Sequence, residues 1–164
     1  MNRLWIFIIL YVVLIYTTLP IARLVLNTLY ETLGAFNLGL LVNTLLVSVS
    51  SFIAIQMYRR KGLTSLVHLL LLGALLVTII LNLDRPEERI HFVEYGLLGF
   101  LFIKAFSSAS VRTLTFSALL VTLIGSVDEL IQWFLPNRVG DLRDVLMNAV
   151  GGLLGVWFGK LYYS

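Results

Sequence analysis

The chain has 164 residues, of which 59% are hydrophobic and 13% are charged, and its net charge is +3. Its mean hydropathy of +0.95 is far above that of soluble domains, which excludes an ordinary soluble globular protein. The weak positive charge forms no basic stripe, so nucleic acid is excluded as a partner. The absence of cysteine excludes disulfides and thiolate chemistry.

Apolar runs follow one another along the chain, with short polar stretches between them. About 20 apolar residues cross a hydrocarbon core of ~30 Å, so such runs predict transmembrane helices in contact with membrane lipid. We therefore expect an all-α, polytopic transmembrane bundle of six helices and one domain over residues 1–164. The first run lacks a small-x-small cleavage site and is expected to be an uncleaved helix that Pro20 halts or kinks. The expected helices cover residues 4–22, 34–57, 63–83, 90–106, 113–135 and 143–163.

The acidic and basic residues are distributed unequally between the two sides of the membrane that these runs imply. If the first run crosses from inside to outside, all 9 acidic residues fall on the outer side. The inner side has no acid, and its basic excess predicts cytoplasmic N- and C-termini by the positive-inside rule. Acids contribute little to that rule, so their sorting favours a polar site that opens outward. The inner basic residues are Arg3, Arg59, Arg60, Lys61, Lys104, Arg112 and Lys160.

The fourth run begins with polar residues at helical spacing. His91, Glu94 and Tyr95 stand at i, i+3 and i+4 and so share one face near the outer end. This spacing makes His91 a candidate general base, with Glu94 as a residue that orients it. Tyr95 is a candidate substrate-binding residue or, alternatively, a member of an interfacial aromatic belt.

The fifth run carries two adjacent acids, Asp128 and Glu129, followed by Gln132. The acids point about 100° apart on a helix, and Gln132 can neighbour either. An ionisable group inside hydrocarbon costs about 2.5–3.5 kcal/mol unless it has a partner, so both acids should face other helices or water. They are candidate catalytic residues, with Gln132 as a substrate-binding residue. The structural alternative is a polar clasp between helices.

The sixth run has one stripe that is polar in its outer half and glycine-rich in its inner half. Glycines at this spacing allow another helix to approach closely, so the stripe should face the bundle. Asp144 is then a candidate catalytic residue and Asn148 a candidate substrate-binding residue. Asp141 and Asp144 also fit an N-cap and an acid in the first helical turn. The stripe comprises Asp141, Asp144, Asn148, Gly152, Gly155 and Gly159, and Gly151 extends it.

These residues fall in sequence blocks that resemble the VanZ-like family of bacterial membrane proteins, named for a member linked to teicoplanin resistance. The resemblance covers residues 87–155 well and the first helix less specifically. It implies a core of about 84–160 plus helix 4–22, with helices 34–57 and 63–83 as additions to shorter members. Glu87-Glu88 stand where many members have Asp-Lys, so any role of that lysine is absent here. The blocks are Tyr16–Pro20, His91–Gly99 and Asp128–Arg138, followed by Asp141, Asp144-Val145, Asn148 and Gly151-Gly152.

The resemblance implies a role in the bacterial plasma membrane that touches cell-wall or lipid substrates. One hypothesis is an enzyme acting on a lipid-linked or phosphorylated envelope substrate, such as a cell-wall precursor, and affecting glycopeptide susceptibility. Its histidine and carboxylates could bind a divalent metal, and Arg138 near the last helix start could hold a phosphate. The alternative is a non-enzymatic accessory protein that binds a lipid or a protein partner in the same cleft. A transporter is less favoured because no acid lies on the inner side.

Overall fold

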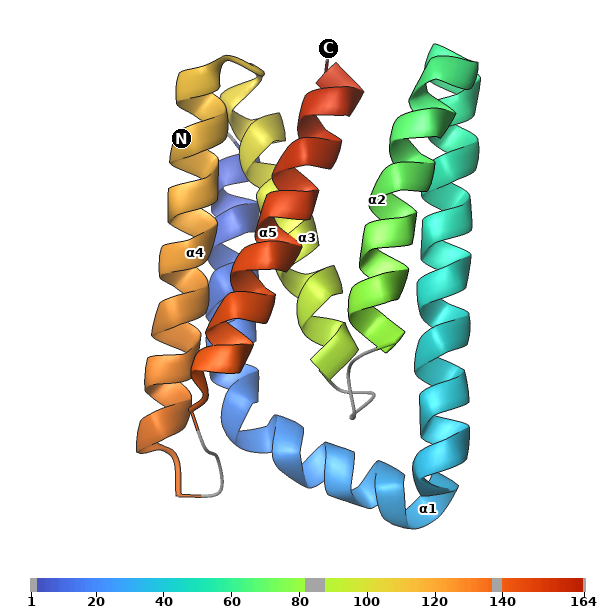
Figure 1. Cartoon of the computed structure of the whole chain (residues 1–164). Helices are drawn as coiled ribbons and strands as arrows, with labels where there is room; N and C mark the ends of the chain where they lie inside the picture. Colours follow the sequence, from blue (N-terminus) through green and yellow to red (C-terminus); the bar gives the residue numbers. More distant parts are fainter. Residues whose placement is uncertain (1–2, 82–87, 137–139, 164) are drawn as a thin grey trace. The chain divides into compact units, whose positions relative to one another are not determined.

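The computed structural model describes residues 3–81, 88–136 and 140–163. Nearly all of these residues lie in helices, which confirms the all-α class (Figure 1). Within the described part, α1, α4 and α5 are long and apolar enough to cross a membrane. The helices are α1 (Arg3–Lys61), α2 (Leu63–Leu81), α3 (Glu88–Phe106), α4 (Val111–Phe134) and α5 (Leu142–Tyr163).

The expectation of six separate helices is not confirmed, because the first two runs are joined in the 59-residue α1. Pro20 lies inside this helix instead of ending it. The Thr17 and Thr18 hydroxyls donate to carbonyls of the preceding turn, at 2.8 Å to Val13 O and 2.9 Å to Leu14 O. Threonine hydroxyls that bond back to the preceding turn bend a helix without ending it, and a membrane helix can kink at a proline and continue. The break comes later, at Gly34, whose φ of 74° favours glycine.

The other helices begin and end within two residues of the predicted ranges. At the start of α4, a capping residue determines where the helix begins. The Ser110 hydroxyl accepts a hydrogen bond from the backbone N–H of Thr113 at 3.3 Å, which satisfies one of the orphan donors of the first turn. Polar or glycine-containing turns interrupt the apolar runs clearly enough for the sequence to indicate these ends.

The chain separates into two compact units. The larger unit comprises residues 1–32 and 91–164, and the smaller one comprises residues 33–90. All candidate site residues belong to the larger unit. In it, the first part of α1 and helices α3, α4 and α5 run alongside one another (Figure 1). The single transmembrane domain stays a prediction.

Glycines bring α5 close to its neighbours in the larger unit, as the predicted stripe requires. A Cβ added at Gly155 would meet the backbone of Gly96 in α3, and one at Gly152 would meet the side chain of Val121 in α4. Gly99 in α3 lies directly against the backbone of Gly152. Only helices without side chains at these points can approach so closely. The prediction that this stripe faces the bundle is therefore confirmed.

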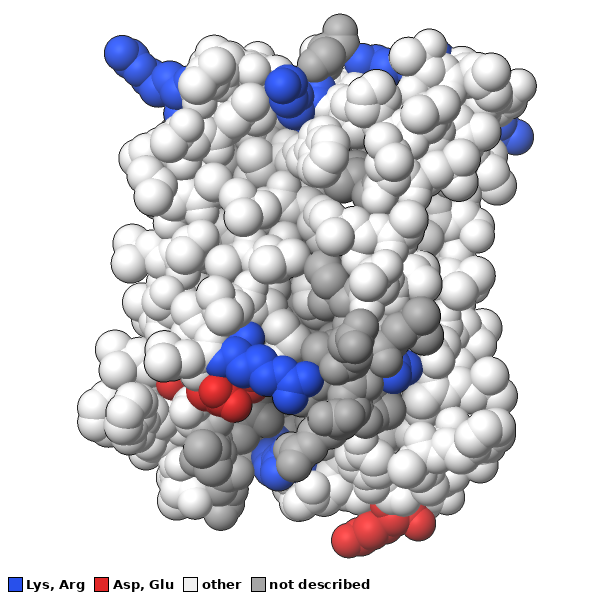
Figure 2. Space-filling model, in the orientation of Figure 1, with Lys and Arg blue, Asp and Glu red and all other residues white. Residues whose placement is uncertain are grey.

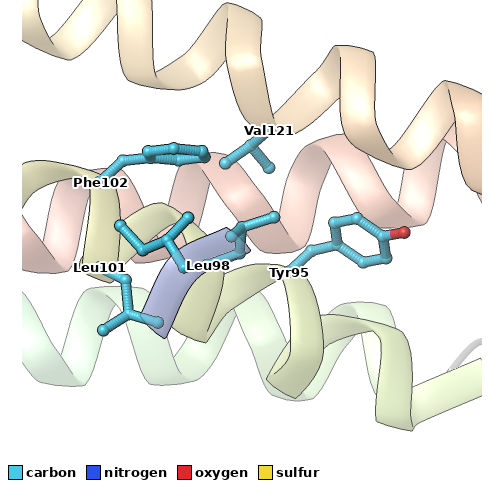
Figure 3. Close-up of a cluster of buried hydrophobic side chains, with 6 residues drawn as sticks. Tyr95, Leu98, Leu101, Phe102 and Val121 are labelled. Carbon is cyan, nitrogen blue, oxygen red and sulfur yellow. The ribbon is translucent and has the colours of Figure 1, made fainter. Parts of the chain in front are cut away.

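A buried apolar cluster fills the middle of the larger unit (Figure 3). Tyr95, Leu98 and Phe102 of α3 pack there with Val121 of α4 and Ile8 of α1. The Tyr95 ring is part of this cluster, whereas its hydroxyl points away from the other labelled side chains (Figure 3). The apolar core thus ends at a tyrosine hydroxyl, where the polar residues begin.

On the face shown in Figure 2, charged side chains gather in an upper and a lower zone, and a broad uncharged zone separates them. Lys104 and Lys160 fall in the last turns of α3 and α5, and Arg112 falls in the first turn of α4. The acids Glu94 and Asp144 lie near the opposite ends of α3 and α5. Because α4 runs opposite to α3 and α5, the basic residues share one end and the acids share the other.

This charge distribution predicts that both termini are cytoplasmic, because the basic residues should stay on the inner side. Reporter fusions placed after residue 61 and after residue 86 are expected to lie on opposite sides of the membrane. A fusion after residue 163 should match the one after residue 61. Equal sidedness of the first two fusions would show that the assignment of spans is wrong.

Candidate functional site

Buried polar side chains of α3, α4 and α5 form a layer that is called the polar layer below. Its members are Tyr95, Asp128, Glu129, Gln132 and Asn148. A short hydrogen bond joins α3 to α4 in this layer. The Tyr95 hydroxyl donates to Asp128 Oδ2 at 2.6 Å, and both residues are buried. A hydroxyl bonded to a carboxylate at this distance makes a strong, charge-assisted interaction. Tyr95 is fully buried, so the interpretation as an aromatic-belt residue at the membrane surface does not fit its position. Its neighbour on the same helix, His91, stacks on its ring with centroids 6.5 Å apart.

Gln132 joins the two acids of α4, as its spacing predicts. Its Nε2 donates to Glu129 Oε1 at 2.9 Å and more weakly to Asp128 Oδ1 at 3.4 Å. All three side chains are buried. The expectation that the acids face other helices rather than lipid is therefore confirmed. One amide group fixes the orientation of both carboxylates.

Glu129 also holds the chain segment that leads into α5. Its Oε2 accepts a hydrogen bond from the backbone N–H of Asp141 at 3.3 Å. Gly140 fits closely against the Glu129 backbone carbonyl, where a Cβ would lie only 2.6 Å from that oxygen. This contact explains why glycine precedes Asp141. Glu129 thus has a structural role in positioning the start of α5.

Asp141 is the N-cap of α5, which confirms the structural reading of that residue. Its Oδ1 accepts the backbone N–H of Arg143 at 2.9 Å, and its carbonyl accepts the N–H of Asp144 at 3.1 Å. Asp144 lies in the first turn, where a negative charge is stabilised by the helix dipole. Asp141 itself is exposed, whereas Asp144 is half-buried.

Asn148 brings α5 into the same layer. Its Nδ2 donates to the Gly125 carbonyl at 3.4 Å, and its side chain is fully buried. The Gly125 position lies between Asn148 and the Tyr95 ring, with an added Cβ 2.7 Å from Asn148 Cβ and 3.3 Å from Tyr95 Cε1. Among the described residues, Asn148 Oδ1 has no hydrogen-bond partner. A buried amide oxygen of this kind is an acceptor available to a water or a ligand.

Glu94 and Arg138 are the remaining predicted site residues. Glu94 is half-buried on α3, and its backbone carbonyl accepts the Tyr11 hydroxyl at 3.2 Å. Arg138, the expected anion-binding residue, lies outside the described residues. The clustering of His91, Glu94, Glu129 and Asp144 therefore stays a prediction, whereas Tyr95, Asp128, Glu129, Gln132 and Asn148 form the layer that the structure brings together.

The sequence leaves a divalent metal as one possibility, and the described residues contain no cluster that fits one. Nowhere in that part of the chain do three His, Asp or Glu side chains gather closely enough to hold a metal ion. The adjacent acids of α4 are directed instead at Tyr95, Gln132 and the Asp141 backbone.

Two tyrosines of α1 line this region and were not among the predicted site residues. Tyr16 donates to the Ile124 carbonyl of α4 at 2.9 Å, and Tyr11 donates to the Glu94 carbonyl of α3. Their hydroxyls tie α1 to the two helices that carry the polar layer. The sequence signal was available for Tyr16, which stands in the block Tyr16–Pro20. Tyr11 follows no recognisable pattern.

Exposed aromatic residues indicate the depth of the layer. Trp133 and Phe134 at the end of α4 are 74% and 81% exposed, and Leu142 begins α5 with 81% exposure. Exposed aromatics at helix ends are typical of the membrane interface. Glu129 lies only about one turn below Trp133, so the layer is near the interface rather than at the bilayer centre. This position lowers the cost of keeping two acids in a membrane bundle.

The helical fold, the apolar exterior and the buried polar layer near one end define an all-α integral membrane protein. Comparison with protein-family models identifies the family within this class. The VanZ/LLP1 model matches residues 4–163. The chain belongs to the VanZ/LLP1 family. The division into a core and two additional helices stays a prediction. Neither the curated proteins nor the solved structures include a match to this chain.

The Tyr95–Asp128 hydrogen bond should contribute to the stability of the larger unit. Tyr95→Phe removes the hydroxyl and leaves a buried carboxylate with one donor fewer, which is expected to cost about 1.5–3 kcal/mol. Thermal unfolding in detergent measures this loss. Tyr11→Phe is the control, because its bond to a half-buried carbonyl should be worth less. Equal melting temperatures for Tyr95→Phe and the native chain would contradict the prediction.

Proposed function

We propose that this protein of the bacterial cell envelope binds the polar headgroup of a lipid-linked envelope substrate in its polar layer. Asn148 carries the proposal. Its amide oxygen is fully buried beside Tyr95 and is an acceptor without a partner among the described residues. Burial of such a group is costly unless a water or a ligand satisfies it.

The chemistry of the layer favours a headgroup rich in hydrogen-bond donors. Asp128 and Glu129 supply carboxylate oxygens and Asn148 supplies an amide oxygen, all of which are acceptors. Sugar hydroxyls and peptide N–H groups are the matching donors, and a lipid-linked cell-wall precursor carries both. Its lipid tail would lie against the apolar helix surfaces, and the interfacial depth of the layer suits a headgroup at the outer leaflet. Binding of such a precursor would alter susceptibility to glycopeptides, which act on the same class of molecule.

Lipid extraction from the purified protein, followed by mass spectrometry, tests the proposal. The native chain is expected to retain a hydroxyl-bearing or peptide-bearing lipid well above its share of the membrane. Asn148→Leu should lose that lipid, because the acceptor is replaced by an apolar group of similar size. Ser117→Ala is the matched control. Ser117, on α4, is fully buried like Asn148, but it lies outside the polar layer. Retention of bulk membrane lipid alone by the native chain would contradict the proposal.

An enzymatic role is the second candidate, and the arrangement around Tyr95 favours it. His91 stacks on Tyr95, and Tyr95 bonds to Asp128, which places a base, a hydroxyl and a carboxylate in one row. Groups of this kind can transfer protons to or from a bound headgroup. Turnover of a retained lipid by native protein but not by His91→Gln would support catalysis. Retention without turnover would favour a binding or accessory protein.

A further inference from the structure

Residues 21–32 of α1 continue the helix beyond the length that a membrane crossing needs. Residues 3–20 alone extend roughly 27 Å at ~1.5 Å per residue, close to the ~30 Å of a hydrocarbon core. The helix then continues through Pro20 as far as the break at Gly34. The 12 residues after Pro20 therefore need a place outside the first crossing.

The direction of this segment within the larger unit is visible in the structure. The first, dark-blue part of α1 runs alongside α4, and the lighter blue part after it turns across the end of the unit (Figure 1). This is the end at which α4 finishes and α5 begins. The segment thus lies at the same end of the larger unit as Asp141 and the polar layer.

The sequence of the segment is amphipathic when it is placed on a helix. Arg23, Asn27 and Glu31 stand at i, i+4 and i+8 and form a polar stripe. A second, apolar stripe consists of Ile21, Val25 and Leu29. Each of these residues is two positions away from a residue of the polar stripe. Two positions correspond to about 200° around a helix, so the two stripes lie on roughly opposite sides. This pattern is typical of helices that lie in the plane of a membrane surface.

Two of the three residues of the apolar stripe are exposed. Ile21 is 58% exposed and Val25 is 48% exposed, whereas Leu29 is half-buried. Leu24, which is 69% exposed, and Tyr30 lie on the polar side. Thr28 and Thr32 lie on the apolar side, where their hydroxyls are bonded to carbonyls of their own helix. Lipid at the boundary of headgroups and acyl chains fits both stripes, because it offers an apolar and a polar environment on opposite sides of one helix.

We propose that residues 21–32 form an interfacial helix that lies in the headgroup region of the bilayer, with the Ile21–Val25–Leu29 stripe toward the acyl chains and the Arg23–Asn27–Glu31 stripe toward water. The helix rests in the leaflet at the polar-layer end of the protein. It joins the first crossing to the chain that returns after Gly34. The inference is independent of what the polar layer binds.

Cysteine scanning tests this placement without background, because the native chain has no cysteine. Val25→Cys and Leu29→Cys are compared with Asn27→Cys and Glu31→Cys in open membrane sheets, where a water-soluble maleimide reaches both faces. The polar-stripe cysteines are expected to react roughly tenfold faster, because an apolar face sinks ~5–10 Å into the headgroup and acyl boundary. Equally fast labelling at all four positions would show a solvated segment, and equally slow labelling would show a buried one. Either result would overturn the proposal.

A matched pair of charge variants provides a second measurement. Val25→Glu and Asn27→Glu each add one acid, two residues apart, on opposite faces of the segment. Val25→Glu is expected to lower the melting temperature in lipid nanodiscs, whereas Asn27→Glu should leave it near the native value. Equal melting temperatures of the two variants, with both proteins folded, would contradict an amphipathic placement.

Discussion

Glu129→Gln is expected to abolish retention of the bound envelope lipid while the protein still inserts and folds. The substitution keeps the size of the side chain but removes a buried negative charge near the membrane interface. Function should respond more than folding, because a headgroup that donates hydrogen bonds loses an ionised acceptor. The measurements are mass spectrometry of the retained lipid and thermal unfolding in the same detergent.

Some loss of stability accompanies this change, and its size can be estimated. Glu129 accepts from Gln132 Nε2 and from the Asp141 N–H, and an amide has only one oxygen to offer them. One lost buried hydrogen bond costs about 1–3 kcal/mol. Tyr16→Phe is the control, because it also removes a single tertiary hydrogen bond, to the Ile124 carbonyl, without altering either acid.

The two variants distinguish a functional role of the Glu129 carboxylate from a purely structural role as a clasp between helices. If Glu129 acts only as a clasp, Glu129→Gln and Tyr16→Phe should reduce lipid retention in proportion to their loss of stability. If the carboxylate binds the headgroup, Glu129→Gln should lose retention at a melting temperature at which Tyr16→Phe keeps it. Native-like retention by Glu129→Gln would leave Glu129 with the structural role alone.

Gly155→Ala is expected to disrupt the larger unit by separating α3 from α5. The added methyl group would overlap the backbone of Gly96, and a backbone cannot turn aside as a flexible side chain can. Forcing extra volume into a packed interface costs about 1–3 kcal/mol, and occasionally more. For a chain of this size the loss corresponds to a fall in melting temperature of roughly 2–12 °C.

Gly73→Ala is the matched control for this substitution. Gly73 also lies within a helix, but a Cβ added there meets nothing within 4 Å. Alanine favours helix formation by up to ~1 kcal/mol over glycine, so Gly73→Ala should melt at the native temperature or slightly above it. A Gly155→Ala variant as stable as Gly73→Ala would show that α3 and α5 do not pack through these glycines in the membrane.

The sequence by itself determined the helical class, most helix ends and the inward face of α5. These features follow from local rules, since apolar length, turn residues and the spacing of Gly151, Gly155 and Gly159 all act within one segment. It also determined that Gln132 neighbours both acids, because that geometry belongs to a single helix. It could not determine that α1 continues through Pro20, because a proline can either end or only kink a membrane helix.

Only the tertiary structure decided which partners the polar residues have. The Tyr95–Asp128 bond joins two helices, and the contact between Glu129 and the Asp141 N–H joins α4 to the segment before α5. Such pairings depend on the rotation and depth at which helices meet, and no periodicity within one helix encodes them. The same limit explains Tyr11, whose hydroxyl reaches α3 from a helix with no other polar signal at that point. The sequence identified the acids, and packing between helices made them parts of one polar layer.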